Sequence, residues 1–383
     1  MAQSQGFRIG RVIGIPIYID FSWIIIFSLI SYALSAQFNQ LHPQWTAVQH
    51  WAVGIFTSLL FFGSVLFHEL AHSVVAQHYK LKVVSITLFI FGGLARIARE
   101  PSKPIQEFNI AIAGPIASGF LSGMFFLATL VFSQNQMVVA LATYLSVSNG
   151  LLALFNLLPG FPLDGGRIFR AIVWGATNNF SKATLVAGAS GKLIAYGMIA
   201  FGLWTTFRPD KHDWQGIWSV LVGWFLLNAA NASVQQVTIR ETLTGLTAAD
   251  VMSNEVPTIP GNMSLDEYSG EVLRTGRRVH VVTSDGRLVG LMNVTALNTL
   301  PRDEWDMNSV QAVMVPRDKI LWAAPEEPLQ RLLERLISAD VNQMPVVKHD
   351  EAGSANIVGM VTRDAILRVI QTRSELGAAM AAR

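Results

Sequence analysis

The stretch His68-Glu69-Leu70-Ala71-His72 decides the fold, because it ends an apolar run, Trp51–Phe67, that contains no charged residue. A run of this length predicts a membrane-spanning helix. Residues four apart lie on one face of a helix with Cβ atoms about 5–6 Å apart, so His68 and His72 can present ring nitrogens to one small cation. Glu69 can reach the same place from the side. The spacing is typical of a site where two imidazoles hold zinc and a carboxylate is the general base.

Coincidence is the alternative interpretation of this motif. With 8 His in 383 residues, the pattern arises by chance in roughly one such chain in a hundred. In a soluble helix, a hydrogen-bonded structural His pair would compete with a metal site. Within a bilayer, lipid offers no partners to two His and a Glu, and this favours the metal site.

The composition describes two unlike halves. Hydrophobic residues make up 51% of the chain and charged residues 14%, and the charge is concentrated after Arg240. The absence of Cys excludes disulfides and thiolate ligands, so zinc must be held by His and carboxylate. A net charge of +2 gives no support for nucleic-acid binding. Arg8 and Arg11 precede a full apolar span without a small-residue cleavage site, which predicts an uncleaved first helix.

Six apolar segments are long enough to cross a membrane. They are Phe21–Phe38, Trp51–Tyr79, Phe108–Phe132, Met137–Leu158, Thr184–Phe207 and Trp214–Val234. Basic residues concentrate in cytoplasmic connections. The connections after the second and fourth segments hold Lys80, Lys82, Arg96, Arg99, Lys103, Arg167, Arg170 and Lys182, whereas the opposite-side connections hold only Arg208 and Lys211. We therefore expect both termini, and the end of the His-bearing helix, on the cytoplasmic side.

Two β-type runs within Val83–Ile97 surround Phe91-Gly92-Gly93, and a two-glycine turn between such runs predicts a hairpin. At membrane depth, a strand edge must be buried in protein or line a wet cavity. The edge at Gly92 and Gly93 can then pair with an unwound substrate segment through main-chain hydrogen bonds. A cytoplasmic surface hairpin is the alternative, since a sequence does not show which edge is free.

A second motif, Asn-Leu-Leu-Pro-Gly-Phe-Pro-Leu-Asp-Gly-Gly-Arg at positions 156–167, ends the fourth segment. Its prolines and glycines break the helix and leave Asp164 at membrane depth. A catalytic zinc usually has three protein ligands and one open position, and Asp164 is the best candidate for the third. The other acidic residues near the segments lie before the first one or on the opposite side: Asp20, Asp210 and Asp213. A helix cap for Gly165–Gly175 is the alternative role for Asp164.

Two further features near these motifs allow a structural or a functional interpretation. Asn156 can donate to a developing oxyanion or hold the substrate strand, or it can serve in capping or packing. The third segment carries Ala113-Gly114-Pro115 and more small residues up to Gly123. This pattern favours close helix packing, with a kink beside the site as the alternative.

These motifs together carry a resemblance. A His-Glu-x-x-His span followed by Asn-x-x-Pro and Leu-Asp-Gly on a later span resembles the site-2 protease family of intramembrane zinc metalloproteases, over about Arg8 to Val234. The resemblance implies that Val83–Ile97 is a re-entrant β element near the substrate path. It also implies one zinc ion bound by His68, His72 and Asp164, with Glu69 as general base and Asn156 in the active site. The absence of a PDZ-like insertion indicates the branch whose regulatory module follows the last span.

The second half contains an internal repeat. Ala249–Met252 recurs as Gln311–Met314, Arg278–Val282 as Gln343–Val347, and Leu288–Met292 as Ile357–Val361. Each unit predicts a helix such as Leu329–Ser338, two strands around a polar turn, and a helix such as Asp364–Gln371. The repeat resembles a tandem pair of CBS domains.

Such pairs often bind adenosine nucleotides, with a Thr and an Asp three residues later contacting ribose. Here Thr362 is present, but position 365 is Ala and Asp364 stands one residue early. The first unit has Asn293 and Ala296 instead. The pair therefore leaves open a weak nucleotide site near Thr362 and Asp364, and equally a structural or homodimerising role.

The sequence thus predicts an α-helical integral membrane protein of about six transmembrane helices with a re-entrant β-hairpin, followed by an α/β tandem CBS module. The predicted boundaries are 1–240 for the transmembrane zinc metalloprotease domain, 245–303 and 307–372 for the CBS domains, and 373–383 for a C-terminal tail.

The predicted activity is hydrolysis of a peptide bond in or near a transmembrane segment, with modulation by the CBS pair. The resemblance suggests a single-span regulatory substrate, such as an anti-sigma factor or a membrane-tethered transcription factor. We expect a multi-pass protein of a bacterial cell membrane, with the N-terminus and CBS module cytoplasmic. The alternatives are a CBS-gated transporter or channel with a structural metal site, and an inactive scaffold, against which the intact Glu69 argues.

Overall fold

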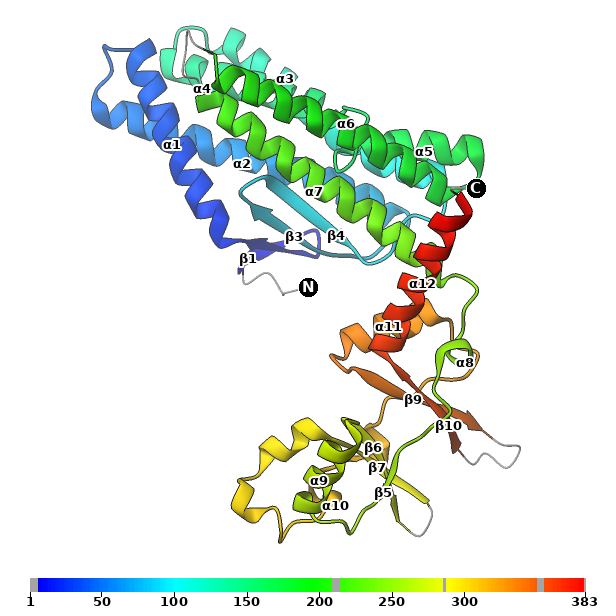
Figure 1. Cartoon of the computed structure of the whole chain (residues 1–383). Helices are drawn as coiled ribbons and strands as arrows, with labels where there is room; N and C mark the ends of the chain where they lie inside the picture. Colours follow the sequence, from blue (N-terminus) through cyan, green and yellow to red (C-terminus); the bar gives the residue numbers. More distant parts are fainter. Residues whose placement is uncertain (1–5, 209–213, 285–286, 350–354, 382–383) are drawn as a thin grey trace. The chain divides into compact units, whose positions relative to one another are not determined.

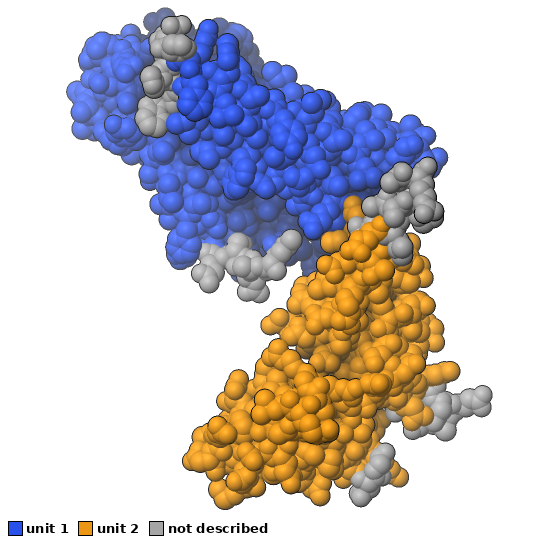
Figure 2. Space-filling model, viewed as in Figure 1, with its two compact units in different colours: residues 1–237 blue, residues 238–383 orange. Residues whose placement is uncertain are grey.

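A computed structural model describes residues 6–208, 214–284, 287–349 and 355–381. The chain divides into two compact units, Met1–Val237 and Thr238–Arg383 (Figure 2). Three residues that the sequence predictions used lie outside the described residues: Asp210, Lys211 and Asp213.

The first unit is built from long helices, shown in blue to green in Figure 1. They are α1 (Phe21–Leu41), α2 (Ala47–His78), α3 (Pro104–Val131), α4 (Gln136–Asn156), α5 (Asp164–Thr177), α6 (Phe180–Thr206) and α7 (Trp214–Leu243), whose last residues belong to the second unit. Among the described residues, six helices are long and apolar enough to span a membrane, all of these except α5. The predicted six-span architecture is confirmed, with helix ends within a few residues of those expected except that α7 continues beyond Val234.

Polar caps begin several of these helices at the expected places. The Asp20 side chain accepts from the amide of Ser22 at 2.9 Å and begins α1. Thr46 and Gln49 form a capping box at the start of α2. Asn179 accepts from the amide of Lys182 at 2.8 Å and begins α6. Each cap satisfies an amide that the helix itself leaves unpaired, and so fixes where the helix begins.

Side-chain hydrogen bonds join helices α2, α3 and α4. Ser122 donates to the Ser146 carbonyl at 2.7 Å, and Ser146 donates to the Ser122 carbonyl at 2.9 Å. Buried Asn149 donates to the Ser64 hydroxyl at 3.2 Å. Lipid supplies no hydrophobic force between helices, so close packing and such bonds hold spans together. These bonds tie both α2 and α3 to α4.

A four-stranded sheet with the order β1-β2-β3-β4 lies against this helical unit. Its strands are β1 (Phe7–Val12), β2 (Ile15–Ile19), β3 (Val83–Phe89) and β4 (Gly92–Ile97). The predicted hairpin is confirmed as β3 and β4, which leaves β4 at one edge. The first two strands were not predicted; their signals were the turn residue Gly14, at positive φ, and the alternating Ile15, Ile17 and Ile19.

The glycine pair of the hairpin is not its turn, contrary to the prediction. Ile90 and Phe91 form the turn, whereas Gly92 and Gly93 open β4 and pair with Phe89 and Leu88. The reason lies on α2: an added Cβ on Gly93 would lie 2.5 Å from Cγ of Glu69. The glycine therefore serves close approach rather than turn formation.

The second unit contains two small sheets. Its elements are α8 (Ala248–Val251), β5 (Thr258–Pro260), α9 (Leu265–Thr275), β6 (Val279–Ser284), β7 (Arg287–Asn293), η1 (Val294–Thr299), η2 (Arg302–Glu304), α10 (Val310–Val313), β8 (Val315–Pro316), η3 (Arg317–Lys319), α11 (Leu329–Ser338), β9 (Gln343–His349), β10 (Ala355–Thr362) and α12 (Arg363–Ala381). The sheets have the orders β5-β6-β7-β8 and β10-β9. Helix α12 continues through most of the segment 373–383 that the sequence set apart as a tail.

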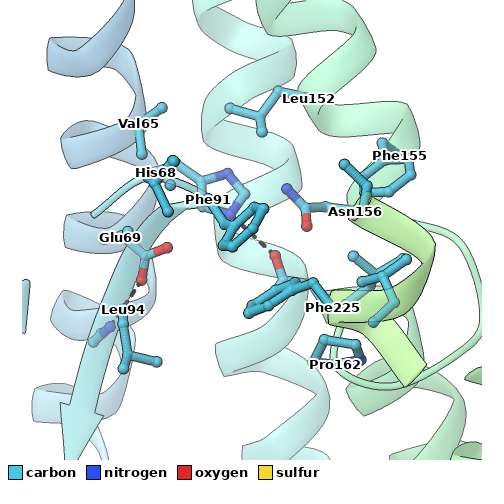
Figure 3. A pocket seen from close by; sticks show the side chains of 18 of the residues that line it. Val65, His68, Glu69, Phe91, Leu94, Leu152, Phe155, Asn156, Pro162 and Phe225 are labelled. Carbon is cyan, nitrogen blue, oxygen red and sulfur yellow. Dashed lines mark hydrogen bonds and ion pairs between the residues drawn. The ribbon is translucent and has the colours of Figure 1, made fainter. Parts of the chain in front are cut away.

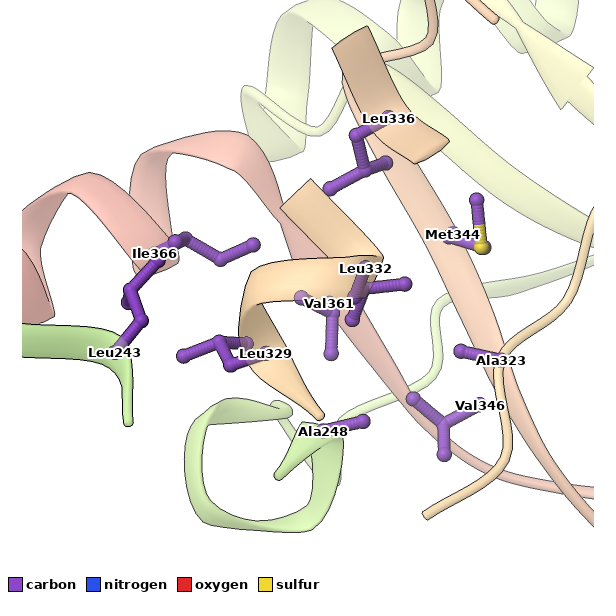
Figure 4. Close-up of a cluster of buried hydrophobic side chains, with 10 residues drawn as sticks. All are labelled: Leu243, Ala248, Ala323, Leu329, Leu332, Leu336, Met344, Val346, Val361 and Ile366. Atoms are coloured by element: carbon purple, nitrogen blue, oxygen red, sulfur yellow. The ribbon is translucent and has the colours of Figure 1, made fainter. Parts of the chain in front are cut away.

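The two repeats exchange their opening segments. Ala248, from the first repeat, is buried with Leu332 and Val346 of the second (Figure 4). Val310, from the second repeat, is buried with β6 and β7 residues such as Val282. Each repeat thus completes the core of the other, so the second unit folds as one body despite its internal repetition.

Candidate metal centre and active site

Three side chains from separate parts of the sequence converge in the first unit. Nε2 of His68 lies 3.0 Å from Oδ2 of Asp164, and Nε2 of His72 lies 3.1 Å from the same oxygen. The two Nε2 atoms are 3.2 Å apart. Ligand atoms on a tetrahedral zinc, with bonds of about 2.0–2.1 Å, lie roughly 3.3 Å from one another. The triangle of donor atoms therefore fits one such ion.

Proton positions support the same conclusion. Nδ1 of His72 lies 2.6 Å from the Ile110 carbonyl oxygen, which can only accept, so the proton of the neutral ring is on Nδ1. Its Nε2 then directs a lone pair at a carboxylate oxygen and at the other imidazole. Nδ1 of His68 contacts the Ser118 hydroxyl at 2.9 Å, which allows the same tautomer. The three atoms that face one another are all hydrogen-bond acceptors in this arrangement. A single proton could be shared by only one pair of them, whereas one divalent cation can bind all three.

Gly114 provides the space for this cluster. An added Cβ at this position would collide with Nε2 of His72 and would lie 2.6 Å from Nε2 of His68. Any larger residue on α3 would therefore occupy the volume in which the two imidazoles meet. The sequence had placed Gly114 in a packing pattern, and only the structure shows that it belongs to the site.

One face of α3 supports the cluster over several turns. Ile110, Gly114 and Ser118 are four residues apart and so lie on the same face. Ile110 orients the His72 ring, Gly114 leaves the cluster its room, and Ser118 orients the His68 ring. Hydrogen bonds of this kind fix which ring nitrogen faces a metal.

Glu69 faces the same pocket from α2. Its Oε2 accepts a hydrogen bond from the Ala95 amide of β4 at 3.2 Å, and the side chain is half-buried. The edge strand of the sheet is therefore fixed directly beside the carboxylate, with Gly93 allowing the approach.

Asp164 is placed by the helix break and by glycines. It is the first residue of α5, after the turn that ends at Pro162 and Leu163. The Phe161 amide donates to the Ala187 carbonyl of α6 at 3.2 Å, and the Ser190 hydroxyl donates to the Pro159 carbonyl. Added Cβ atoms on the two glycines after Asp164 would collide with the backbone of the break. The double glycine therefore lets α5 begin where its carboxylate meets the His pair.

A buried ion pair fixes α5 to α3. Nε of Arg170 donates to Oε1 of Glu107 at 2.8 Å, and Nη2 donates to the same oxygen. The Glu107 side chain has no exposed surface. The Arg170 guanidinium also lies over the Phe161 and Phe180 rings, 4.9 and 4.6 Å from their centroids. One ion pair thus joins the helix bearing Asp164 to the helix bearing Gly114 and Ser118.

A cavity of about 660 Å³ opens beside the metal-site cluster, which consists of His68, His72 and Asp164. Asn156 lines it, and Figure 3 shows its carboxamide pointing into the cavity from the end of α4. Phe91 of the hairpin stacks on Phe225 of α7, with ring centroids 4.2 Å apart. Aromatic and aliphatic side chains form most of the wall, and such a wall suits an apolar peptide segment.

The structure brings together all the residues that the sequence proposed for the protease site. His68, His72, Asp164, Glu69, Asn156, Gly92 and Gly93 all line this one cavity. Two residues proposed for a nucleotide lie in the second unit: Thr362 ends β10 and Asp364 is in the first turn of α12. Sequence reasoning missed four residues that support the cluster: Glu107, Gly114, Ser118 and Arg170. Glu107 and Arg170 did carry a signal, as charged residues beside apolar spans.

Comparison with protein families gives matches in both halves of the chain. Residues 56–141 and 132–196 match the model of peptidase family M50. Residues 310–372 match the model of the CBS domain.

Individual relatives cover nearly the whole chain. "Putative zinc metalloprotease sll0528" of Synechocystis sp. is 32% identical over 96% of this chain and 96% of its own length. Zinc metalloprotease MJ0392 of Methanocaldococcus jannaschii is 31% identical over 76% of this chain and 79% of its own length. A solved site-2 protease from M. jannaschii is 31% identical, covers 60% of this chain and 95% of that chain, and has a TM-score of 0.44. The chain therefore belongs to peptidase family M50, the site-2 protease family, and is a multi-pass membrane zinc metalloprotease with a C-terminal CBS region.

Proposed function

We propose that this protein hydrolyses a peptide bond within or beside a transmembrane helix of another, single-span membrane protein. The observation that supports the proposal is the meeting of three atoms that could hold a metal ion, from His68, His72 and Asp164, beside a mostly apolar cavity. A helical substrate must first unwind there, because helical hydrogen bonds shield its carbonyl groups.

In this proposal, His68, His72 and Asp164 hold one zinc ion, and Glu69 is the general base. Zinc bound there would supply Lewis-acid polarisation of the scissile carbonyl and would acidify a water molecule. Glu69 keeps Oε2 on the Ala95 amide, which leaves Oε1 to take a proton from water and later to deliver it to the leaving amine. The bond from Ala95 also holds the carboxylate in place during both transfers.

The edge of β4 is the proposed binding place for the unwound substrate. Strand β4 ends the sheet order, and Gly92 and Gly93 lie at the cavity wall. Main-chain hydrogen bonds to such an edge would hold an extended segment with little dependence on its sequence. Asn156, across the cavity, would donate to the substrate carbonyl or to the oxyanion that forms from it.

We propose a regulatory role for the second unit, with CBS domains at 245–303 and 307–372. Thr362 accepts from the Ala365 amide at 3.0 Å, which supports a capping role for the hydroxyl. A nucleotide site near Thr362 and Asp364, if formed, would have to share that hydroxyl. Homodimerisation through the CBS pair is the other proposed role.

The proposed substrates are membrane-tethered regulators such as anti-sigma factors or transcription factors, and the proposed location is a bacterial cell membrane. The N-terminus and the CBS module would face the cytoplasm, because the connections rich in Lys and Arg flank the metal-site end of the helices.

One experiment tests the proposed chemistry. The purified protein would be assayed for bound metal and for cleavage of a model transmembrane peptide, together with Glu69→Gln and Asp164→Ala. We expect one zinc per chain, loss of cleavage but not of metal in Glu69→Gln, and loss of metal in Asp164→Ala. A folded sample that binds no metal would contradict the proposal and favour the CBS-gated transporter or channel.

A further inference from the structure

Two arginines of α5, Arg167 and Arg170, share one buried carboxylate of α3, that of Glu107. Glu107 accepts hydrogen bonds from Arg170. Nε of Arg167 lies farther from the same carboxylate, 3.9 Å from Oε1 of Glu107. Arg170 also contacts the Thr184 hydroxyl with Nη1 at 3.4 Å. The Arg167 side chain makes no hydrogen bond to the part of the chain that the structure describes, and its ion pair with Glu107 is its one salt bridge there. Glu107 thus balances the charge of Arg170, its hydrogen-bonded partner, and the Arg167 guanidinium has no hydrogen-bonded carboxylate among the described residues.

The Arg167 side chain faces the active-site cavity. Arg167 lines the cavity together with His72 and Glu69, and its side chain is 23% exposed. Asp164 and Arg167 are three residues apart on α5 and so lie on the same side of the helix. Arg167 is therefore the basic residue closest in sequence to Asp164, and its guanidinium lies on the same face of α5 as the Asp164 carboxylate.

Peptide hydrolysis creates a group that needs such a cation. The oxygen of water bonds to the carbonyl carbon, the carbon–nitrogen bond breaks, and both protons of the water leave with the amine, which departs as an ammonium group. The other fragment ends in a carboxylate, so a new negative charge appears in a mostly apolar cavity, where an unpaired charge is costly. A guanidinium can meet a carboxylate with two parallel hydrogen bonds, which an ammonium cannot.

We propose that Arg167 binds the new C-terminal carboxylate of the amino-terminal cleavage product. The inference rests on the proposed function, since it needs the carboxylate that peptide hydrolysis forms. Arg167 contacts the product in this scheme, while Arg170 only positions α5. The same guanidinium would also stabilise the negative charge on these oxygens in the tetrahedral intermediate that precedes cleavage of the carbon–nitrogen bond.

The test measures binding of two peptides that differ in one group. An acetylated leucine–alanine hexapeptide with a free C-terminal carboxylate, and the same peptide as a carboxamide, would be titrated into the full chain carrying Glu69→Gln. Each titration is done with metal and after chelation, because a metal ion itself attracts carboxylates. In the chelated protein we expect a carboxylate preference of roughly tenfold, the effect of a charge-assisted hydrogen bond.

The variants decide the assignment. Arg167→Gln should remove the preference in the chelated protein, Arg167→Lys should retain part of it, and Arg99→Gln, a charge-matched change outside the cavity, should leave it unchanged. Persistence of the preference in Arg167→Gln, or its absence from the parent protein, overturns the inference. Cleavage of a model transmembrane peptide by the wild type is assayed separately. Failure of that cleavage contradicts the proposed function. Cleavage by the wild type, with no carboxylate preference in the chelated parent protein, contradicts only the role of Arg167.

Discussion

At the scale of single residues, the site depends on the absence of a side chain at Gly114. We expect Gly114→Ala to weaken zinc binding by roughly 10- to 100-fold, because its Cβ would occupy the space where His72 and His68 meet. Gly119→Ala is the matched control on the same helix, since an added Cβ there has nothing within 4 Å. Metal titration of both purified variants checks the prediction, and equal affinities would contradict it.

His280 is a residue-scale feature of the second unit. It is 2% exposed, and neither ring nitrogen has a hydrogen-bond partner in the described part of the chain. Burial lowers the pKa of His280, nearby Glu271 raises it and Arg277 lowers it, and the net direction is downward from 6.5. Below pH 6.5 the unfolded chain therefore binds more protons here than the folded chain. The contribution of His280 to stability is present above that pH and falls as the pH falls.

The corresponding variant is His280→Phe, which keeps a ring beside Tyr268. Thermal unfolding of the full chain between pH 7.5 and 5.5 should show a smaller loss of Tm for the variant than for the wild type. Parallel Tm curves for the two proteins would show that His280 does not titrate as its burial implies.

At the scale of elements, the ion pair between α3 and α5 helps to hold the helix that carries Asp164 in place. Arg170→Met should destabilise the protein by about 3–5 kcal/mol, because it leaves the Glu107 carboxylate buried without its main partner. It should also weaken metal binding, since α5 loses its attachment to α3. The double variant Glu107→Leu with Arg170→Met removes both charges and should recover most of the stability. Thermal unfolding and metal titration of the three proteins test this; a double variant no more stable than Arg170→Met would count against it.

The elements also show what a sequence can reveal about this molecule. The His pair, Glu69 and the helix break could be predicted, because helical spacing and the cost of charge in lipid act locally along the chain. Gly114 could not be assigned to the site, since a glycine's role depends on what approaches it from α2. The β1–β2 hairpin was missed although Gly14 marks its turn, because its strands are short and only β2 pairs with β3. The exchange of opening segments between the CBS repeats could likewise not be predicted, because the two repeats have the same sequence pattern.

At the scale of the whole molecule, the distribution of basic residues predicts which side of the membrane each connection faces. The natural chain has no Cys, so one introduced cysteine is a unique label for a membrane-impermeant maleimide. Lys82→Cys, between α2 and β3, should react only from the cytoplasmic side. Gln44→Cys, in the connection between α1 and α2, should react only from the opposite side. Both positions are exposed in the structure, so failure to label cannot be attributed to burial in the protein. Reaction of both positions from the same side would contradict the prediction that α2 spans the membrane. Reaction of each position from the side opposite to the expected one would reverse the proposed orientation and place the metal-site end of the bundle outside the cytoplasm.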